Sequence, residues 1–383
     1  MFLIMKNKKN SVLYIINVDW YFNLHWLERV EYFKSLGYEI HIITNFTDET
    51  IKGTLLSKGY ICHDLNLKRK GMNLFSEFLY VLRLGRFLQS IKPNLIHSIT
   101  IKPVLYSGLL NSFFYRKPIV YSITGRGAVF TSRKIKFVLL RGLIKKLYKF
   151  ISINTSRFIF ENEEDHLFFE SVGILKYNNG NVIKGAGIDL GRFKPDRYPN
   201  NGSILFASRL LEDKGLRCLV EASRLLKARG YKFSLNVAGI IDTDVSSAIP
   251  LSQIEQWDVD GEINWLGNVK DMPSLINQND VVCLPTTYGE GIPRILIEAA
   301  ACGRCIITTD VPGCREVVIH RENGYLVPPN SAEDTANAIA KLLSEPELRV
   351  AMGYKSRIKA EREFDQNIVF GMTAQVYENI LKS

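Results

Sequence analysis

The sequence predicts an α/β protein made of two Rossmann-like domains that face each other across a deep cleft. Short apolar strands alternate with helical stretches in both halves of the 383-residue chain, and a stretch rich in Gly, Pro and Asn at 184–201 separates the halves. Strands that alternate with helices form parallel βαβ units, and domains hold roughly 100–200 residues. We therefore expect one domain at residues 1–183, a second at 184–365, and a C-terminal helix at 366–383 that packs back on the first.

Local patterns place the expected elements. In the first half we expect a helix around residues 24–36 and strands at 12–17, 39–44, 95–97, 118–123, 150–154 and 157–161. In the second half the expected strands are 203–208, 233–238, 263–266, 280–285, 305–309 and 324–327. The expected helices of that half are 215–228, 272–277, 293–302, 331–344 and 346–363. Ligands of such domains bind at the carboxyl ends of the strands.

The composition is that of a globular protein, with 46% hydrophobic and 23% charged residues. No apolar run reaches the roughly 18 residues that a membrane-spanning helix needs. The first ten residues, MFLIMKNKKN, place apolar residues before lysines, which reverses the order of a secretory signal. We therefore expect a cytoplasmic protein without a spanning helix.

Six cysteines are scattered along the chain, as is usual in a reducing compartment. Cys302 and Cys305 have the spacing of a metal-binding pair, but no second pair or histidine follows at the spacing of a zinc site. We expect the two thiols to pack at a junction between a helix and a strand, and we predict no metal site.

The charge is concentrated in the first half. Residues 1–190 carry 27 Lys and Arg against 14 Asp and Glu, whereas the remainder carries 22 against 25. A basic half favours an anionic partner, such as nucleic acid, a polyphosphate substrate or the anionic face of a membrane. No zinc finger, RNA-recognition signature or basic recognition helix accompanies this charge, so we do not expect nucleic acid as the partner.

The strongest local motif runs from a strand through a glycine-flanked turn into a helix, at residues 285–303. Its glycines let the backbone approach a ligand closely. The amides of Gly291 and Ile292 precede the expected helix, where the helix dipole favours an anion. Pro293 suits the first helical turn.

Two carboxylates of this motif, Glu290 and Glu298, stand eight residues apart. They are too far apart to act as an acid/base dyad, and they suit hydrogen bonding to sugar hydroxyls. The alternative for Glu298 is a helical ion pair with Arg294, four residues earlier.

A second motif, SRLLEDKG at residues 208–215, follows the first strand of the second domain. Arg209 stands at the end of the strand, and Lys214 opens the next helix. Two cations beside a helix N-terminus form a candidate clamp for a diphosphate, and the alternative is a solvated loop.

The whole chain resembles glycosyltransferase family 4, whose members are retaining enzymes with the GT-B fold. Residues 208–215 resemble the donor-phosphate segment of that family, 289–318 with 323–329 resemble its paired-glutamate donor signature, and 185–195 resemble the opening of its second domain. The resemblance implies a nucleotide-sugar co-substrate and no cofactor or metal. It implies catalytic roles for Glu290, Arg209 and Lys214, and a donor ribose contact for Glu298.

In the first half, residues 17–25, 97–103, 123–127 and 161–165 resemble one subgroup of the family. That subgroup builds bacterial polysaccharide repeat units, such as O-antigen or capsule, on a polyprenyl-diphosphate carrier. The resemblance implies a hexosyl- or N-acetylhexosaminyl-transferase with a lipid-linked acceptor, and a UDP-sugar as the commonest donor.

The candidates for the acceptor side are His25, His97, Lys102 and Arg126. Lys102 suits the diphosphate of the acceptor, and the histidines suit polar contacts or a proton relay. The alternative for each histidine is a structural role. Many members of the family carry a histidine near Arg126, where this chain has Thr-Gly-Arg, and the subgroup tends to have an apolar residue there.

Residues 133–150 carry seven basic residues and no acidic one, and Phe137, Leu140, Ile144 and Leu147 recur at helical spacing. This pattern predicts a basic amphipathic helix that lies on an anionic membrane. We therefore expect peripheral contact with the inner face of the plasma membrane. The alternative is that the apolar face packs on the core of the first domain.

Three other functions remain open at this stage. A nucleotide-sugar epimerase shares the fold but needs acid/base carboxylates in the first domain, where we see no such cluster. A glycosyltransferase with a soluble acceptor is the second alternative. A two-domain sugar-binding protein is the third, and such proteins usually work outside the cytosol.

Overall fold

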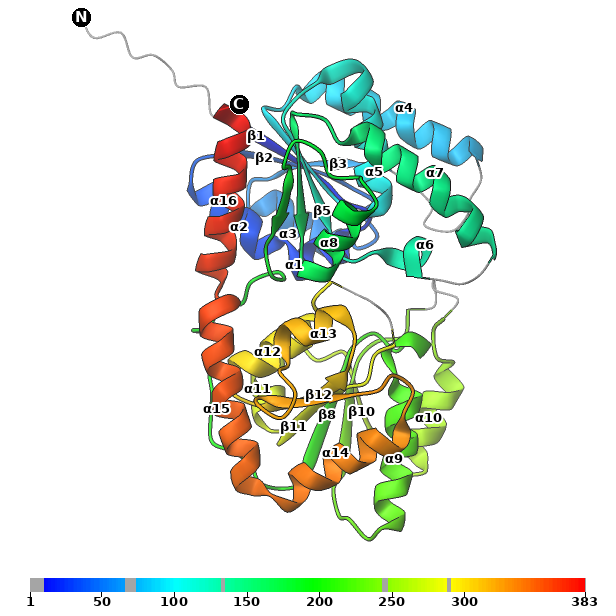
Figure 1. Cartoon of the computed structure of the whole chain (residues 1–383). Coiled ribbons are helices and arrows are strands. Elements are labelled where there is room, and N and C mark those ends of the chain that lie inside the picture. The colour runs from blue at the N-terminus through cyan, green and yellow to red at the C-terminus, as the bar shows by residue number, and fades with distance from the viewer. Residues whose placement is uncertain (1–9, 66–73, 132–134, 243–246, 288–290, 383) are drawn as a thin grey trace, which may run out of the picture. The chain divides into compact units, whose positions relative to one another are not determined.

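The computed structural model describes residues 10–65, 74–131, 135–242, 247–287 and 291–382 (Figure 1). The chain divides into two compact units, which we call unit 1 (residues 1–186 and 370–383) and unit 2 (residues 187–369). Each unit holds one parallel sheet with helices around it. The prediction of an α/β protein with two Rossmann-like domains is confirmed.

The sheet of unit 1 has the strand order β3-β2-β1-β4-β5-β6-β7, and all neighbouring strands are parallel. Its strands are β1 (Ser11–Ile15), β2 (Glu39–Thr44), β3 (Ile61–Asp64), β4 (Leu95–Ile99), β5 (Ile119–Ile123), β6 (Ser156–Phe160) and β7 (Gly180–Val182). The central strands β1, β4 and β5 bury every residue, as parallel strands do when helices cover both faces.

The helices of unit 1 connect these strands. They are α1 (Asp19–His25), α2 (Leu27–Ser35), α3 (Glu49–Ser57), α4 (Leu74–Ile91), α5 (Ile101–Leu110), η1 (Asn111–Tyr115), α6 (Gly127–Thr131), α7 (Ile135–Ile151) and α8 (Glu163–Ser171). Helices α4, α5 and α7 pack together beside the sheet (Figure 1). The expected helix at 24–36 is two helices, because the backbone leaves the helical conformation at Trp26.

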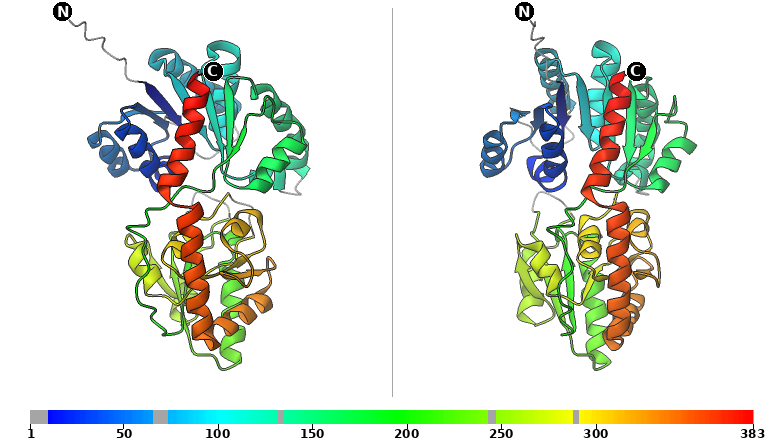
Figure 2. Two further views of the ribbon diagram at one scale, coloured as in Figure 1. Left: turned by 60° about the vertical axis from the view of Figure 1, so that its left-hand side comes forward. Right: turned by 90° about the vertical axis from the view of Figure 1, so that its left-hand side faces the viewer.

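The C-terminal helix α16 (Gln366–Lys382) lies against unit 1 (Figure 2). Tyr377 is fully buried there, stacks on Phe33 with 4.4 Å between ring centroids, and donates to the hydroxyl of Tyr14 at 3.1 Å. These contacts fasten the end of the chain to the core of unit 1.

The sheet of unit 2 has the order β10-β9-β8-β11-β12-β13, again with parallel neighbours. Its strands are β8 (Ser203–Ala207), β9 (Ser234–Ala238), β10 (Asn264–Gly267), β11 (Val281–Leu284), β12 (Cys305–Thr309) and β13 (Gly324–Val327). Its helices are η2 (Glu212–Lys214), α9 (Leu216–Ala228), α10 (Leu251–Val259), α11 (Met272–Asn277), α12 (Arg294–Ala301), α13 (Pro312–Val317), α14 (Ala332–Ser344) and α15 (Pro346–Glu363).

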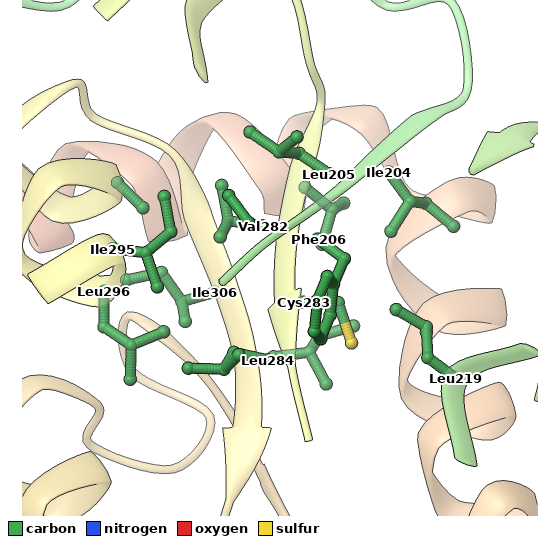
Figure 3. Packing of buried hydrophobic residues seen from close by; sticks show 14 of the residues in the cluster. Ile204, Leu205, Phe206, Leu219, Val282, Cys283, Leu284, Ile295, Leu296 and Ile306 are labelled. Carbon is green, nitrogen blue, oxygen red and sulfur yellow. The ribbon is translucent and has the colours of Figure 1, made fainter. Parts of the chain in front are cut away.

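Helices on both sides of this sheet bury the side chains of its central strands (Figure 3). Phe206 and Ile306 of the strands are fully buried, as are Leu219 of α9 and Leu296 of α12. Burying one such side chain contributes about 1.5–3 kcal/mol. The core therefore holds the strand ends, and the loops that follow them, in fixed positions.

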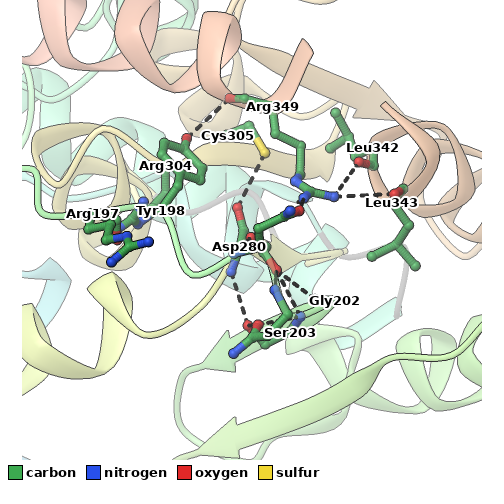
Figure 4. Close-up of polar contacts among 12 residues, drawn as sticks. Arg197, Tyr198, Gly202, Ser203, Asp280, Arg304, Cys305, Leu342, Leu343 and Arg349 are labelled. Atoms are coloured by element: carbon green, nitrogen blue, oxygen red, sulfur yellow. Dashed lines mark hydrogen bonds and ion pairs between the residues drawn. The ribbon is translucent and has the colours of Figure 1, made fainter. Parts of the chain in front are cut away.

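A buried carboxylate anchors the chain where it enters unit 2 (Figure 4). Asp280, directly before β11, accepts backbone N–H groups of Asn201, Gly202 and Ser203 at 2.7–3.1 Å, and its other oxygen lies 3.7 Å from Arg349 of α15. Asp280 is fully buried, so its bonds to the backbone replace the water it has lost. This network fixes the amino end of the sheet.

One expected strand is wrong. Residues 150–154 do not form a strand, because α7 continues to Ile151 and a turn then leads into β6. The apolar residues Ile144, Tyr148 and Ile151 keep helical spacing and are all buried. This spacing shows why the segment continues the helix.

Candidate active site

The strand order of unit 2 places its topological switch point between β8 and β11. From β8 the chain moves outward to β9 and β10, and it then returns to β11 on the other side. Open parallel sheets bind ligands at the carboxyl ends of such strands. Both sequence motifs, residues 208–215 and 285–303, begin at this point because they directly follow β8 and β11.

The loops after β8 and β11 are joined to each other. The backbone N–H of Thr287 donates to the carbonyl of Asp213 at 2.8 Å, and the hydroxyl of Thr286 donates to the same carbonyl at 3.0 Å. Gly215 has a positive φ of 81°, and a Cβ placed on it would lie 2.0 Å from the carbonyl oxygen of Pro285. Only glycine therefore allows this approach.

The two predicted cations lie in the loop after β8. Lys214 ends η2 and is 7% exposed, whereas the Arg209 side chain is 35% exposed. The Nη1 atom of Arg209 lies 3.2 Å from Oδ2 of Asp242. The structure thus places both cations in the loop at the switch point, and their role toward a diphosphate stays a prediction.

Asp242 was missed at the sequence level. It follows β9, the strand beside β8, and its side chain is only 12% exposed. The signal was its position a few residues after a strand that ends at the same edge of the sheet. Its carboxylate holds the Arg209 guanidinium in one orientation.

Helix α12 begins at Arg294, and Pro293 is its N-cap rather than part of its first turn. Gly291 and Ile292 directly precede this N-cap and are both buried. Glu290 lies outside the described residues, so its predicted catalytic role stays a prediction.

Glu298 is 7% exposed and pairs with Arg294 one helical turn earlier, at 2.9 Å between Oε1 and Nε. This is the ion pair that we considered as the alternative to a ligand contact. The pair lies within α12, and the role of Glu298 toward a donor stays a prediction.

Unit 1 has its own switch point, between β1 and β4. Thr100 follows β4 with a φ of 70°, which is strained for a residue other than glycine. Lys102 lies in the first turn of α5 and forms an ion pair with Glu77 of α4, which also accepts the hydroxyl of Tyr106 at 2.7 Å. Lys102 is half-exposed and lies at the expected end of the sheet.

The histidine candidates differ. His97 lies inside β4 and is fully buried, with Nδ1 bound to the hydroxyl of Tyr377 and Nε2 to Ser122 at 2.8 Å. Burial holds the pKa of His97 well below its usual range. The acceptor-side prediction for His97 is therefore wrong, because both ring nitrogens are used inside the core. His25 ends α1, is partly exposed, and packs on Tyr21 at 4.4 Å between ring centroids.

Arg126 joins the loop after β5 to the start of α8. Its Nε lies 2.7 Å from Oδ1 of Asp165, which is buried, and its guanidinium lies over the ring of Phe168. Burial raises the pKa of Asp165, although the Arg126 charge opposes that rise. The contact holds the loop in place, and any contact of Arg126 with an acceptor stays a prediction.

The predicted membrane face of α7 points inward. Ile144 belongs to the core of unit 1, and Leu140 and Leu147 pack against it. The alternative reading of this face, as part of the domain core, is therefore correct.

Several other features do not add to the site. All six cysteines are free, and burial raises the pKa of Cys302 and of Cys305 to about 12. A cavity of about 440 Å³ lies near Ser203, Ser234 and Asn264, at the amino ends of β8–β10, so it is at the wrong edge of the sheet for the switch point.

Among the described residues, no three His, Cys, Asp or Glu side chains gather in a way that could hold a metal ion. In the described part of the chain, no helix is both long and apolar enough to cross a membrane.

Comparison with known proteins agrees with this geometry. The profile of "Glycosyl transferases group 1" matches residues 188–359, and that of "Glycosyl transferase 4-like" matches residues 11–162. The chain belongs to glycosyltransferase family 4. The switch point of unit 2 therefore lies within the part of this glycosyltransferase that matches the group 1 profile.

Two curated relatives match most of the glycosyltransferase. The N,N'-diacetylbacillosaminyl-diphospho-undecaprenol alpha-1,3-N-acetylgalactosaminyltransferase of Campylobacter jejuni is 27% identical over 84% of this chain and 88% of its own length. The capsular polysaccharide biosynthesis glycosyltransferase CapM of Staphylococcus aureus is 25% identical over 92% of this chain and 93% of its own length.

Solved structures share the fold. Anabaena HepE in complex with UDP and glucose has a TM-score of 0.77 at 18% identity and covers 97% of this chain and 100% of its own. Sucrose-phosphate synthase from Thermosynechococcus elongatus has a TM-score of 0.79 at 18% identity, with 98% and 100% covered. The GT-B fold expected from the sequence is confirmed.

Proposed function

We propose that this glycosyltransferase moves a hexose or N-acetylhexosamine from a UDP-sugar to a saccharide carried on a polyprenyl diphosphate, with retention at the anomeric carbon. The step belongs to the synthesis of a bacterial cell-surface polysaccharide. The two relatives that match most of the chain support this acceptor class, because their names describe an undecaprenyl-diphosphate acceptor and capsule synthesis.

The proposed donor site rests on one observation: the two loops at the switch point of unit 2 are bonded to each other. The contact of Gly215 with Pro285, and the bonds from Thr286 and Thr287 to Asp213, fix the loop that bears Arg209 and Lys214 against the loop that leads into α12. Such preorganised cations stabilise charge as it develops on a departing diphosphate.

In the proposed mechanism the acceptor hydroxyl attacks the anomeric carbon from the face that the diphosphate leaves. The C–O bond to the β-phosphate breaks as the new glycosidic bond forms, and a phosphate oxygen takes the proton of the acceptor. Arg209 and Lys214 stabilise the charge on the leaving group, the backbone before α12 assists, and Glu290 contacts the sugar hydroxyls. No protein nucleophile, metal or cofactor takes part.

On the acceptor side we propose that Lys102 binds the diphosphate of the carrier, and that His25 and Arg126 of the same unit also contact the acceptor. The protein would work in the cytoplasm, at the inner face of the plasma membrane where such a carrier lies. An epimerase or a transferase with a soluble acceptor is not favoured, because the two full-length relatives are named as transferases of polysaccharide synthesis.

The test is a transfer assay with a set of UDP- and GDP-sugars and a polyprenyl-diphosphate saccharide in detergent. Wild type should transfer one UDP-sugar with retention, unaffected by EDTA. The turnover of Lys214→Ala should fall by a factor of roughly 10²–10³, while its melting temperature stays that of wild type. Lys227→Ala, on the exposed face of α9, is the matched control. Near-normal turnover in Lys214→Ala, or strict dependence on a metal, would contradict the mechanism.

A further inference from the structure

Helix α7 has a second apolar face, opposite the one that packs on the core. Ile135, Val138, Leu139 and Leu143 are all exposed, with Ile135 at 79% and Leu139 at 77%. Their spacing of three and four residues puts them on one stripe of the helix. A soluble helix normally fills such a stripe with polar residues, and within the described parts of the chain nothing covers this face.

The end of this stripe continues onto η1. Phe150 of α7 contacts Phe113 of η1, with 4.9 Å between ring centroids, and Phe113 and Phe114 are 62% and 74% exposed. The hydroxyl of Tyr115 donates to the carbonyl of Gly85 at 2.8 Å, which fixes η1 on α4. The aromatic rings are therefore held outward by a rigid base.

The stretch of chain that forms this surface is basic. Residues 78–160 carry fifteen Lys and Arg and no Asp or Glu. Lys146 is exposed within the stripe itself, and Arg116 directly follows η1. The charge argues against self-association, because two copies of this surface would bring like charges together. The basic charge favours a partner that has an anionic outer layer with apolar material beneath it.

We propose that the surface formed by η1 and the outer stripe of α7 docks on an anionic lipid bilayer, with Phe113, Phe114, Ile135 and Leu139 inserted at the headgroup level. The proposal deepens the proposed function, because an enzyme with a lipid-linked acceptor must meet it at a membrane. It differs from the sequence-based expectation in the residues that insert, since Ile144 and its neighbours face the core.

The test is flotation with vesicles of phosphatidylcholine, alone or mixed with phosphatidylglycerol. Wild type should float with the mixed vesicles at low salt, much less at high salt, and hardly at all with phosphatidylcholine alone. Ile135→Ser/Leu139→Ser and Phe113→Ser/Phe114→Ser should each bind roughly 10–100-fold more weakly, because each removes two inserting side chains.

The matched control is Val259→Ser/Tyr354→Ser, which changes two exposed apolar residues of unit 2 and should float like wild type. Transfer to a detergent-dispersed acceptor separates this proposal from the proposed function, because the η1 and α7 variants should keep that activity. The docking surface is overturned if wild type stays at the bottom of the gradient, or if the variants float equally well. It is also overturned if light scattering finds a wild-type dimer that the variants lose, since the surface would then be a self-association face.

Discussion

The two sheets have the same strand order around their switch points, yet the loops at those points are built differently. In unit 2 the loops after β8 and β11 bond directly to each other, through Asp213 and the close approach of Gly215. In unit 1 the segments near the switch point are tied by side-chain ion pairs to other helices, as Lys102 is to Glu77. Backbone contacts leave a glycine pattern in the sequence, whereas ion pairs between distant helices leave none.

The largest effect is expected from a methyl group between the donor loops. Gly215→Ala places a Cβ against the carbonyl of Pro285 and strains a residue with a φ of 81°. We expect turnover to fall by roughly 10²–10³, as when a preorganised donor is lost. Gly230→Ala is the control, because Gly230 has a φ of 84° but nothing within 4 Å of the added Cβ. Equal activity in the two variants would show that the loop contact does not build the site.

The role of Glu298 is separable from its ion pair. If Glu298 binds the donor ribose, Glu298→Gln should weaken donor binding roughly tenfold or more, because the ribose hydroxyls then donate to a neutral amide instead of a carboxylate. Arg294→Gln removes the same ion pair and should leave donor binding much closer to that of wild type. Matching losses of affinity and melting temperature in both variants would make the pair purely structural.

For His97 we predict a pH dependence of stability rather than a kinetic effect. Burial holds its folded-state pKa below the unfolded value of about 6.5, so its neutral form stabilises the fold above that pH. The stability is lost as pH falls from about 6.5 toward the folded pKa, by up to about 1.4 kcal/mol per pH unit. Urea unfolding should show this loss in wild type and less of it in His97→Gln. An acceptor KM that rises sharply in His97→Gln, with stability unchanged, would restore the acceptor role.

A smaller effect is expected at Asp242, which orients Arg209. Asp242→Asn keeps the shape but weakens a charged contact of 3.2 Å, so we expect turnover to fall roughly fivefold. Asp260→Asn, at the exposed end of α10, is the control. Unchanged turnover in Asp242→Asn would mean that Arg209 is held by other contacts.

The sequence was sufficient to predict many of the strands and helices of unit 2. Strands β12 and β13 and helices α11 and α15 fall at the expected residues, because buried runs and prolines mark their ends. The segment that bears Arg209 and Lys214 could be placed at a strand end, because its motif directly follows the first expected strand of the second domain. The contact between Asp242 and Arg209 could not be predicted, since it joins loops that follow two different strands.

Unit 1 was harder to predict from the sequence, for a physical reason. Helix α7 has apolar residues on two faces, and spacing alone does not show which face packs on the core. In the sequence, His97 is a polar residue near the end of a strand, but its partner Tyr377 comes from the other end of the chain. Such contacts depend on the tertiary fold, which local periodicity does not encode.

If the switch point of unit 2 binds the diphosphate of a nucleotide donor, titration of UDP by calorimetry will show it. Arg209→Ala should bind UDP roughly 10–100-fold more weakly, because a charge-assisted contact to phosphate is lost. Arg217→Ala, whose guanidinium pairs with Glu212 on the exposed side of the same segment, should bind UDP like wild type. Equal affinity of Arg209→Ala and wild type, or an equal loss in both variants, would contradict the account.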